Sequence, residues 1–367
     1  ADRFHIRLRD LRLGVTQDIA ADWDRSVEEL VFSEDSETLY ATARDTGQKP
    51  LFAIALDGGQ PRKLVSEGSV AAISLAGERL VYTWDDLDSP TDIYTLESGK
   101  NLRLTRVNAE AMAKQKLGEY EQFSFSGAQG DTVYGYVVKP TGYVPGRKYP
   151  VAFLIHGGPQ SSLSNYWQYR WNPQIYAGAG YVAVMVDFHG SVGYGQAYTD
   201  AIRGNWGGKP LEDLQKGLSA AAKKYPFVDA TRACALGASY GGYMVNWIAG
   251  QWKDRFRCLV SHAGIFDQRT FYYSTEELWF PEWEQLGTHY DKPDEYSTWN
   301  PVRYVKDWKT PMLVSHGQLD YRIPVEQGLA TFTALQRRNV PSRFLVFPDE
   351  NHWILKPQNS VQWHTEV

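Results

Sequence analysis

The spacing of apolar residues along the chain changes near residue 120. Before that point, short runs that mix apolar and polar positions lie between turns rich in Gly, Asp and Ser, which predicts short β-strands. After it, continuous apolar runs alternate with amphipathic segments, which predicts strands buried on both faces and helices that cover them. We therefore predict two domains, residues 1–118 and residues 119–367.

The first region contains two similar units of short strands. The predicted strands are residues 30–32, 39–42, 51–54 and 62–64 in one unit, and residues 72–74, 80–83, 93–96 and 102–104 in the other. Leu39 corresponds to Leu80 and Leu64 to Leu104, so the repeat is about 40 residues long, the spacing of a β-propeller blade. A strand pair between residues 4 and 13 is expected to end an earlier blade.

Only about two and a half blades fit into this region, whereas a propeller normally closes with about four or more. We expect residues 1–118 to be the last two to three blades of a β-propeller. The chain is then a piece of a longer protein, or one product of a nick. A small β-sandwich is the alternative, and the intact mass of the source protein separates the two interpretations.

The second region predicts an α/β fold. A hairpin is expected over residues 123–139, and strands at residues 151–155, 181–186, 233–236, 258–260, 312–315 and 344–347. Residues 210–224 predict a helix, because Leu211, Leu214 and Leu218 recur at helical spacing. This alternation indicates a mostly parallel sheet flanked by helices.

Ser239 lies at the centre of a Gly-x-Ser-x-Gly motif between a predicted strand and a predicted helix. Gly237 and Gly241 carry no Cβ, so the strand and the helix can approach closely and the serine is exposed on a strained turn. A serine held in this way is typical of a nucleophile. A glycine-rich turn without chemistry is the alternative.

Asp320 and His352 complete a candidate catalytic triad. In the α/β-hydrolase arrangement the acid and then the histidine follow the serine, each after a strand. Asp320 follows the strand at residues 312–315, and His352 follows the strand at residues 344–347. We therefore predict an α/β-hydrolase domain in which Ser239 is the nucleophile, His352 the base and Asp320 the orienting acid.

Other residues fit these roles less well. Asp349 and Glu350 are alternative acids, but they lie too close to His352 in sequence to approach the far nitrogen of its ring easily. Among the other histidines, His5 lies in the blade region, His156, His189 and His262 precede Asp320, and His316 begins the loop of the acid itself. His289 and His364 complete the set, and any one of these residues is more readily structural than catalytic.

A serine hydrolase also needs donors aimed at the developing oxyanion. The backbone N–H of Tyr240, directly after the nucleophile, is one candidate. The second is the N–H of Gly158, in the His-Gly-Gly-Pro turn that follows an early strand. A tight turn without a ligand role is the alternative for Gly158.

Composition excludes some classes of function. Hydrophobic residues make up 43% and charged residues 22%, which fits a globular protein. The net charge is −5 and the sequence has no long basic run, so it gives no indication of a nucleic-acid-binding surface. No apolar stretch is long enough for a membrane span. Cys234 and Cys258 are expected to be buried free thiols, with a disulfide as the less favoured alternative.

Four motifs in order resemble the prolyl oligopeptidase family of serine peptidases. They are residues 156–159 (HGGP), residues 237–242 (GASYGG), residues 316–324 (HGQLDYRIP) and the loop around His352. Residues 206–213, 276–280 and 348–353 most resemble the dipeptidyl-peptidase V branch, with acylaminoacyl peptidases close by. The resemblance covers the chain from about residue 120 to its end, and the blade-like region agrees with that family's propeller.

This resemblance implies a peptidase that cuts short peptides, because the propeller screens the site from folded proteins. The branch implies release of N-terminal dipeptides, with small or apolar residues before the cut, and a periplasmic or secreted location. Family groups that hold the substrate's amino terminus often lie in the propeller, which is incomplete here. The chain also stops at Val367, where relatives usually carry a final helix. The sequence therefore does not separate a dipeptidyl peptidase from an acylaminoacyl peptidase.

The resemblance also places the pocket for the residue before the cut after the strand at residues 258–262. The candidate walls are Ile265, Phe266, Phe271, Tyr272 and Tyr273, although aromatic residues at helical spacing are as often core. Arg322 is expected either to hydrogen-bond a substrate carbonyl or to form a structural ion pair.

The competing functions are an esterase on the same fold and a catalytically silent propeller scaffold that binds partners. Comparing turnover of p-nitroanilide dipeptides and p-nitrophenyl esters distinguishes a peptidase from an esterase. Labelling of Ser239 by a fluorophosphonate distinguishes an active enzyme from a silent scaffold. The predicted chemistry needs no metal or organic cofactor. The sequence leaves open a homodimer, and the remainder of the propeller as a separate chain.

Overall fold

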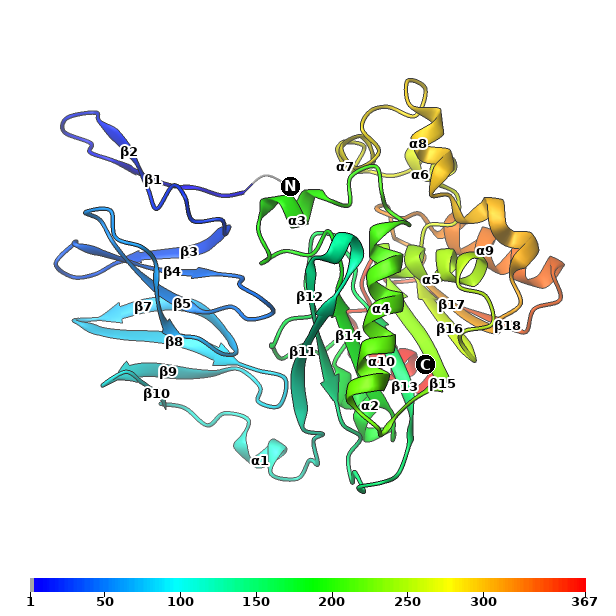
Figure 1. Ribbon diagram of the computed structural model, residues 1–367, viewed down its shortest axis with the longest axis horizontal. Coiled ribbons are helices and arrows are strands. Elements are labelled where there is room, and N and C mark those ends of the chain that lie inside the picture. Colours follow the sequence, from blue (N-terminus) through cyan, green and yellow to red (C-terminus); the bar gives the residue numbers. More distant parts are fainter. Residues whose placement is uncertain (1–2) are drawn as a thin grey trace.

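The computed structural model describes residues 3–367. Three antiparallel sheets, formed by the N-terminal part of the chain, follow one another on the left of Figure 1. They contain β1 (Ile6–Arg9) and β2 (Thr16–Ile19); β3 (Val27–Phe32), β4 (Thr38–Ala43), β5 (Leu51–Ala55) and β6 (Arg62–Val65); and β7 (Ser69–Ala76), β8 (Arg79–Asp85), β9 (Asp92–Glu97) and β10 (Lys100–Arg103). The two four-stranded units expected from the repeat are confirmed, and the strand pair before them is present.

Apolar faces hold these three sheets together. Ile6 and Ile19 of the first pair lie in one buried cluster with Phe52 of β5. Leu51 of β5 and Tyr82 of β8 lie in a second cluster between the two four-stranded sheets. Each sheet therefore buries an apolar face against its neighbour, because exposing that apolar surface to water would cost free energy.

The rest of the chain forms one eight-stranded sheet. Its order is β11-β12-β14-β13-β15-β16-β17-β18, and every pair is parallel except β11–β12 and β12–β14. The strands are β11 (Tyr120–Ser126), β12 (Thr132–Val138), β13 (Tyr149–Ile155), β14 (Val182–Asp187), β15 (Val228–Ala238), β16 (Cys258–His262), β17 (Met312–Gly317) and β18 (Ser342–Phe347). The predicted hairpin and mostly parallel sheet are confirmed.

Helices lie between and around these strands (Figure 1). They are α1 (Ala109–Met112), α2 (Pro173–Gly178), α3 (Gln196–Asp200), α4 (Lys209–Lys224), α5 (Tyr240–Gln251), α6 (Gln268–Tyr272), α7 (Trp279–Glu284), α8 (Pro293–Thr298), α9 (Val325–Arg337) and α10 (Pro357–Glu366), with two 3₁₀ segments, η1 (Ala128–Gly130) and η2 (Pro301–Asp307). The expectation of a missing final helix was wrong, because α10 follows the His352 loop.

The two faces of the sheet form separate cores because successive side chains of a strand point to opposite sides. Phe153 of β13 lies in the larger core with Leu214 of α4 and Val245 of α5. The next residue, Leu154, lies in the smaller core with Ala177 of α2. Helices therefore cover both faces, and the continuous apolar run of β13 is explained by its burial from both sides.

The loop that follows β13 is one of several segments that join the N-terminal sheets to the rest of the molecule, together with β11 and β12. The backbone N–H of Asn165 donates to the carbonyl of Gly47 at 2.8 Å, and the N–H of Leu87 donates to the Asn165 side chain at 3.0 Å. The N–H of Trp167 donates to Asp85 at 2.9 Å. The loop is thus hydrogen-bonded to both four-stranded sheets.

Cys234 and Cys258 form a disulfide, so the prediction of two free thiols was wrong. They are direct register partners on the neighbouring parallel strands β15 and β16, with Cα atoms 4.7 Å apart. That separation lies inside the range that a disulfide requires. The sequence places both cysteines in strands but does not say that these strands are adjacent.

Replacing both cysteines by alanine should lower the free energy of unfolding. A cross-link between residues separated by 24 positions restricts the unfolded chain, and its loss costs about 2–4 kcal/mol. Denaturant unfolding of the wild-type chain and of the double variant, each with and without a thiol reductant, measures the difference. Reductant should weaken the wild type only; equal stability of all four samples would contradict the prediction.

Candidate active site

Ser239 occupies a strained turn between β15 and α5. Its backbone angles, φ of 60° and ψ of −122°, are values that residues other than glycine rarely adopt. A Cβ on Gly241 would lie 2.2 Å from the carbonyl oxygen of Ile155, and one on Gly237 would lie 2.5 Å from the Gly241 backbone. Only glycine fits at these two positions, and their absent side chains allow the turn to project the serine hydroxyl outward.

His352 and Asp320 form a buried pair in the loops after β18 and β17. The Nδ1–H of His352 donates to Asp320 Oδ2 at 2.7 Å. The other carboxylate oxygen accepts the backbone N–H groups of Arg322 at 3.1 Å and Ile323 at 2.9 Å. With three donors on its oxygens, the carboxylate is fixed in place and in turn fixes the orientation of the imidazole ring.

The pKa of Asp320 lies well below its usual value. Burial by itself raises the pKa of this carboxyl, but the hydrogen bonds and charges of His316 and His352 outweigh burial and lower it. Asp320 is therefore ionised at neutral pH. An ionised acid on Nδ1 leaves the opposite ring nitrogen, Nε2, available to accept a proton.

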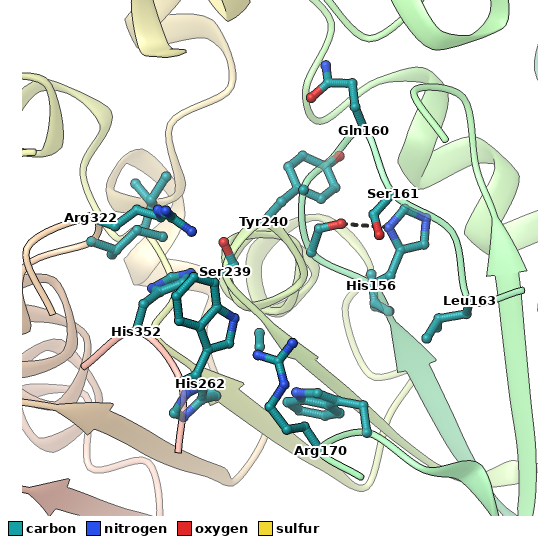
Figure 2. A pocket seen from close by; sticks show the side chains of 18 of the residues that line it. His156, Gln160, Ser161, Leu163, Arg170, Ser239, Tyr240, His262, Arg322 and His352 are labelled. Atoms are coloured by element: carbon teal, nitrogen blue, oxygen red, sulfur yellow. Dashed lines mark hydrogen bonds between the residues drawn. The ribbon is translucent and has the colours of Figure 1, made fainter. Parts of the chain in front are cut away.

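Ser239 and His352 line the same cavity, which has a volume of about 870 Å³. Figure 2 shows the two side chains next to each other, with Tyr240 and Arg322 beside them. Three segments far apart in sequence thus bring the predicted nucleophile, base and acid to one edge of the sheet. This edge is formed by the carboxyl ends of the parallel strands, where open α/β sheets bind ligands.

The two candidate oxyanion donors flank the serine. The Tyr240 N–H belongs to the first turn of α5, where the helix offers no carbonyl partner. On the other side, a Cβ on Gly157 would lie 3.1 Å from the Cβ of Ser239, so the His-Gly-Gly-Pro turn passes close to the nucleophile. Gly158 follows with a φ of +117°, a conformation that glycine adopts without strain.

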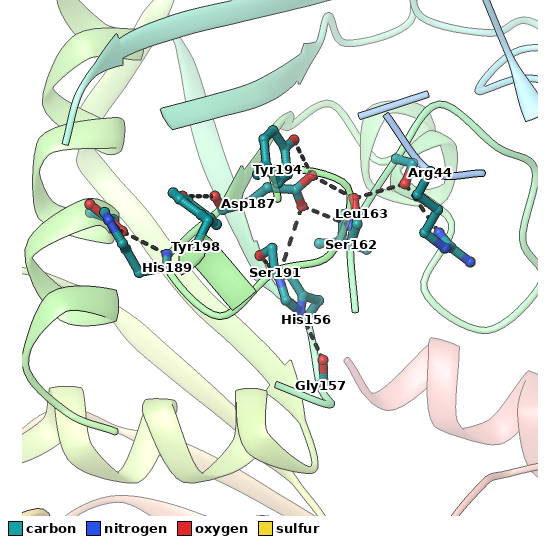
Figure 3. A network of polar contacts seen from close by, with 12 residues as sticks. Arg44, His156, Gly157, Ser162, Leu163, Asp187, His189, Ser191, Tyr194 and Tyr198 are labelled. Atoms are coloured by element: carbon teal, nitrogen blue, oxygen red, sulfur yellow. Dashed lines mark hydrogen bonds and ion pairs between the residues drawn. The ribbon is translucent and has the colours of Figure 1, made fainter. Parts of the chain in front are cut away.

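Buried polar groups hold the loop that carries Gly158 (Figure 3). His156 contacts the hydroxyl of Ser191 through Nε2 at 2.8 Å, and burial lowers the pKa of its ring. At the other end of the loop, Asp187 accepts hydrogen bonds from the Ser162 hydroxyl and from the backbone N–H of Leu163 at 3.0 Å. The loop is therefore anchored on both sides of the turn.

The structure adds Glu284, Gln160 and Trp206, which sequence reasoning missed. Gln160 Nε2 donates to one oxygen of Glu284 at 2.7 Å, and Trp206 Nε1 donates to the other at 2.6 Å. Burial raises the pKa of the Glu284 carboxyl. All three residues line the cavity, so this carboxylate joins the oxyanion loop to the aromatic wall.

The predicted pocket walls are only partly at the cavity. Ile265 and Phe271 line it, as does Arg322. Phe266 does not, because its ring packs on Trp308 in the core, with ring centres 5.9 Å apart. Further aromatic walls come from Trp279, Phe280 and Trp283 of α7. Sequence reasoning did not assign them to the pocket, although this concentration of aromatic residues could have indicated it.

Tyr272 and Tyr273 also need correction as pocket walls. The hydroxyl of Tyr272 donates to Glu282 at 3.0 Å, and its ring packs edge-on against Tyr296. Tyr273 is 65% exposed at the surface. Tyr272 ends the short helix α6 and Tyr273 follows it, and neither lines the cavity.

The rival acids have other partners. Asp349 pairs with Lys356, and Glu350 accepts the backbone N–H groups of Leu355 and Lys356. Arg322 forms the predicted ion pair, with Glu277 at 2.9 Å. Within residues 3–367, no cluster of three or more His, Cys, Asp and Glu side chains is arranged to hold a metal ion. The same residues contain no helix long and apolar enough to cross a membrane.

His262 supports the site from behind. Its carbonyl accepts the backbone N–H of Ser239 at 3.0 Å, and its Nδ1 contacts the hydroxyl of Ser315 at 2.8 Å. Burial, followed by the neighbouring His316 and His352, lowers the pKa of His262 to about 3. The ring is therefore neutral in the folded protein at neutral pH.

These features define a class of protein: a mostly parallel α/β sheet of the α/β-hydrolase kind, with serine, aspartate and histidine at its carboxyl edge. The sequence model of the prolyl oligopeptidase family matches residues 167–367. The chain belongs to the prolyl oligopeptidase family. It is 39% identical over its whole length to dipeptidyl-peptidase 5 of Schizosaccharomyces pombe, covering 54% of that protein. It is 41% identical to a probable dipeptidyl-peptidase 5 of Aspergillus clavatus, with 95% of the chain and 49% of the relative covered.

Solved structures give the same fold. An acylaminoacyl peptidase of Pyrococcus horikoshii superposes with a TM-score of 0.82 at 28% identity, over 92% of this chain and 54% of that one. Dipeptidyl peptidase 4 of Porphyromonas gingivalis has a TM-score of 0.82 at 21% identity, over 100% of this chain and 52% of that one. The chain therefore spans about half the length of the relatives it matches.

The low pKa of His262 predicts a specific loss of stability in acid. The unfolded state takes up a proton near pH 6.5 and the folded state only near pH 3, so falling pH favours unfolding across this interval. The loss approaches about 4 kcal/mol at the lower end, at about 1.4 kcal/mol per pKa unit. Denaturant unfolding at pH 7, 5 and 4 should show a shallower decline for His262→Asn than for the wild type. Identical slopes would contradict the assignment.

Glu284→Met should destabilise the loop that Glu284 anchors. Methionine offers no strong acceptor, so the N–H groups of Gln160 and Trp206 lose their partner, and an unmade buried hydrogen bond costs about 1–3 kcal/mol. Glu284→Gln is the control, because its amide oxygen can accept from Trp206 while Gln160 turns its own amide oxygen toward the new NH2 group. Thermal and denaturant unfolding should show a clear loss of stability in the methionine variant and a smaller loss in the glutamine variant. A methionine variant as stable as the wild type would refute the anchoring role.

Proposed function

We propose that the protein is a serine peptidase that releases dipeptides from the N-termini of short peptides. The observation that carries the proposal is the buried Asp320–His352 pair beside Ser239 on the wall of one cavity. The identity of about two residues in five to fungal proteins named dipeptidyl-peptidase 5 supports the choice of reaction.

In the proposed mechanism, His352 removes the proton of the Ser239 hydroxyl as the oxygen attacks the scissile carbonyl. The N–H groups of Tyr240 and Gly158 stabilise the oxyanion. His352 then protonates the leaving amine, and a water molecule activated by the same ring hydrolyses the acyl-enzyme. Asp320 stays ionised throughout and stabilises the imidazolium, which its depressed pKa favours.

The cavity offers contacts for the residues before the cut. Its apolar walls, which include Ile265 and Phe271, suit an apolar side chain next to the scissile bond. Arg322 reaches the cavity with its guanidinium stacked on Trp353, 4.9 Å from the ring centre. We assign it to a carbonyl oxygen of the bound peptide.

We also propose that the two four-stranded sheets are neighbouring blades of a β-propeller, with residues 1–118 as its final part and residues 119–367 as the peptidase domain. The stacked sheets and the sequence repeat support this. A propeller over the cavity would admit short peptides and exclude folded proteins. The remaining blades would come from the part of the relatives that this chain does not span.

An acylaminoacyl peptidase is the second candidate. The likeness to an acylaminoacyl peptidase of Pyrococcus horikoshii favours it. The two activities share the chemistry at Ser239. They differ in the product released, a dipeptide or an acylated amino acid, and in whether the substrate's amino terminus is free or acylated.

Ser239→Ala should abolish hydrolysis while the protein stays folded. Loss of the nucleophile in a Ser–His–Asp site lowers kcat by about four to six orders of magnitude. Turnover of dipeptide p-nitroanilides, N-acetylated p-nitroanilides and p-nitrophenyl esters measures activity and substrate class together. Ser274→Ala, which removes an exposed hydroxyl bonded to the Thr270 carbonyl, is the matched control. Unchanged turnover in the Ser239 variant, or no fluorophosphonate labelling of the wild type, would reject the proposed mechanism.

A further inference from the structure

Among the described residues, two glutamates and two arginines line the cavity, and one of these four charges has no partner. They are Arg170, Glu277, Glu284 and Arg322. Glu277 pairs with Arg322 at 2.9 Å, and Glu284 accepts hydrogen bonds from neutral side chains. Within residues 3–367, the Arg170 guanidinium contacts the ring of Trp353 but makes no hydrogen bond or ion pair. The cavity therefore holds one positive charge that is unpaired within this part of the chain.

The backbone that carries Arg170 is fixed on both sides. The residue belongs to the loop after β13, in which the N–H of Trp167 donates to Asp85 at 2.9 Å. On the other side, the ring of Trp171 packs edge-on against Trp363 of α10, with ring centres 4.9 Å apart. The position from which the Arg170 side chain enters the cavity is thus set by the fold.

The guanidinium of Arg170 lies near the catalytic base. It is 5.4 Å from the ring centre of Trp353, and that ring is centred 5.4 Å from the ring of His352. The residue is exposed, but its neighbours bury part of the side chain and lower the pKa of the guanidinium. Arginine nevertheless stays charged in proteins. A charge that is partly removed from water and has no partner is stabilised by binding an anion.

The proposed reaction determines which part of a peptide passes Arg170. His352 gives a proton to the leaving amine, so the residues after the cut must pass close to its ring. In Figure 2, Ser239 lies between Arg322 and Arg170, so the two guanidinium groups are on different sides of the nucleophile. Arg322 is assigned to the residues before the cut. Arg170 is therefore on the side of the residues after the cut.

An aromatic wall connects Arg170 to the nucleophile on this side. Trp171 and Trp363 both line the cavity. Trp363 also packs edge-on against His262, with ring centres 6.0 Å apart, and the His262 carbonyl accepts the N–H of Ser239. A peptide that leaves Ser239 toward Arg170 therefore runs along apolar rings, which suit small or apolar residues after the cut.

The spacing limits how many residues fit between the cut and Arg170. Two contacts of 5.4 Å each, through the ring of Trp353, join the guanidinium to the His352 ring. An extended chain spans about 3.3–3.6 Å per residue. Part of the distance is taken up by a hydrogen bond of about 3 Å at each end. The remaining span fits about one or two residues.

We propose that Arg170 binds the C-terminal carboxylate of substrates that have one or two residues after the cut. The inference rests on the proposed peptidase function and names its substrate class: when a dipeptide is released, these substrates are tripeptides and tetrapeptides with a free carboxyl terminus. A carboxylate accepts two parallel hydrogen bonds from a guanidinium, whereas a C-terminal amide brings no charge and one acceptor. The site accordingly favours free acids over amides of the same sequence.

Binding measurements in the Ser239→Ala background test this without requiring turnover. Tetra-alanine, its C-terminal amide and hexa-alanine are titrated calorimetrically against the chain with Arg170 or with Arg170→Gln. We expect the glutamine variant to bind tetra-alanine about 10- to 100-fold more weakly, the usual effect of losing a charge-assisted hydrogen bond. Affinity for the amide, and for hexa-alanine, whose carboxylate lies beyond the guanidinium, should change by less than about fivefold.

Arg338→Gln is the matched control. Arg338 is an exposed arginine at the end of α9 that does not line the cavity, so the variant removes the same charge elsewhere. It should leave all three affinities unchanged. Equal weakening of tetra-alanine and its amide by Arg170→Gln, equal weakening of hexa-alanine, or no weakening of tetra-alanine would overturn the assignment. A similar loss in Arg338→Gln would assign the effect to net charge and overturn it as well.

Turnover in the protein that retains Ser239 separates this proposal from the proposed function. If the wild type and Arg170→Gln release dipeptides equally well from tetra-alanine, the carboxylate site is wrong and the peptidase assignment stands. If the wild type releases no dipeptides from any substrate, the reaction assignment fails, and the binding preference for acid over amide still decides the role of Arg170. Unchanged fluorophosphonate labelling of Ser239 in Arg170→Gln shows that the catalytic groups are intact.

Discussion

The close approach of three backbone segments around Ser239 is the constraint on which the rest of the site depends. The carbonyl of Ile155, the first turn of α5 and the end of β15 meet at distances that leave no room for a Cβ on Gly237 or Gly241. The strained backbone of Ser239 is held by this contact and by the hydrogen bond from its N–H to His262. Backbone strain of this kind persists only where the surrounding structure over-determines it.

Buried carboxylates hold the loops around this turn. Asp320 fixes the acid loop through two backbone N–H groups, Asp187 fixes the far end of the oxyanion loop, and Glu284 joins that loop to Trp206. A buried charge without partners would be costly, so each of these residues resists displacement of the groups that bind it. The site is positioned by polar contacts, whereas the sheet beneath it is positioned by apolar packing.

The sheet could be predicted from the sequence, and so could the chain order of the loops that carry the catalytic residues. Buried parallel strands appear in the sequence as continuous apolar runs, which are easy to detect. The apolar run around Phe153 and the spacing of Ser239, Asp320 and His352 carried that information. Contacts between distant segments could not be predicted in this way. Gln160 and Glu284 are 124 positions apart, and no local sequence pattern indicates that they are hydrogen-bonded.

The disulfide was missed for the same reason, since it depends on which strands are neighbours. Tyr272 of α6 was misassigned as a pocket wall, whereas Phe271 of the same helix was assigned correctly, because side-chain direction on a helix of five residues cannot be read from composition. The Ser239 turn, by contrast, was predictable because glycine marks positions where backbones touch.

The loop after β13 belongs to both parts of the molecule. Its first residues form the turn beside the nucleophile, and its last residues donate to Gly47 and Asp85 in the N-terminal sheets. Asn165 is buried there, so detaching those sheets would exchange its hydrogen bonds with Gly47 and Leu87 for bonds to water, at about 0.5–1.5 kcal/mol each. The N-terminal sheets are thus a structural component of the catalytic centre as well as its neighbour, and the shape of the oxyanion loop depends on both parts staying docked.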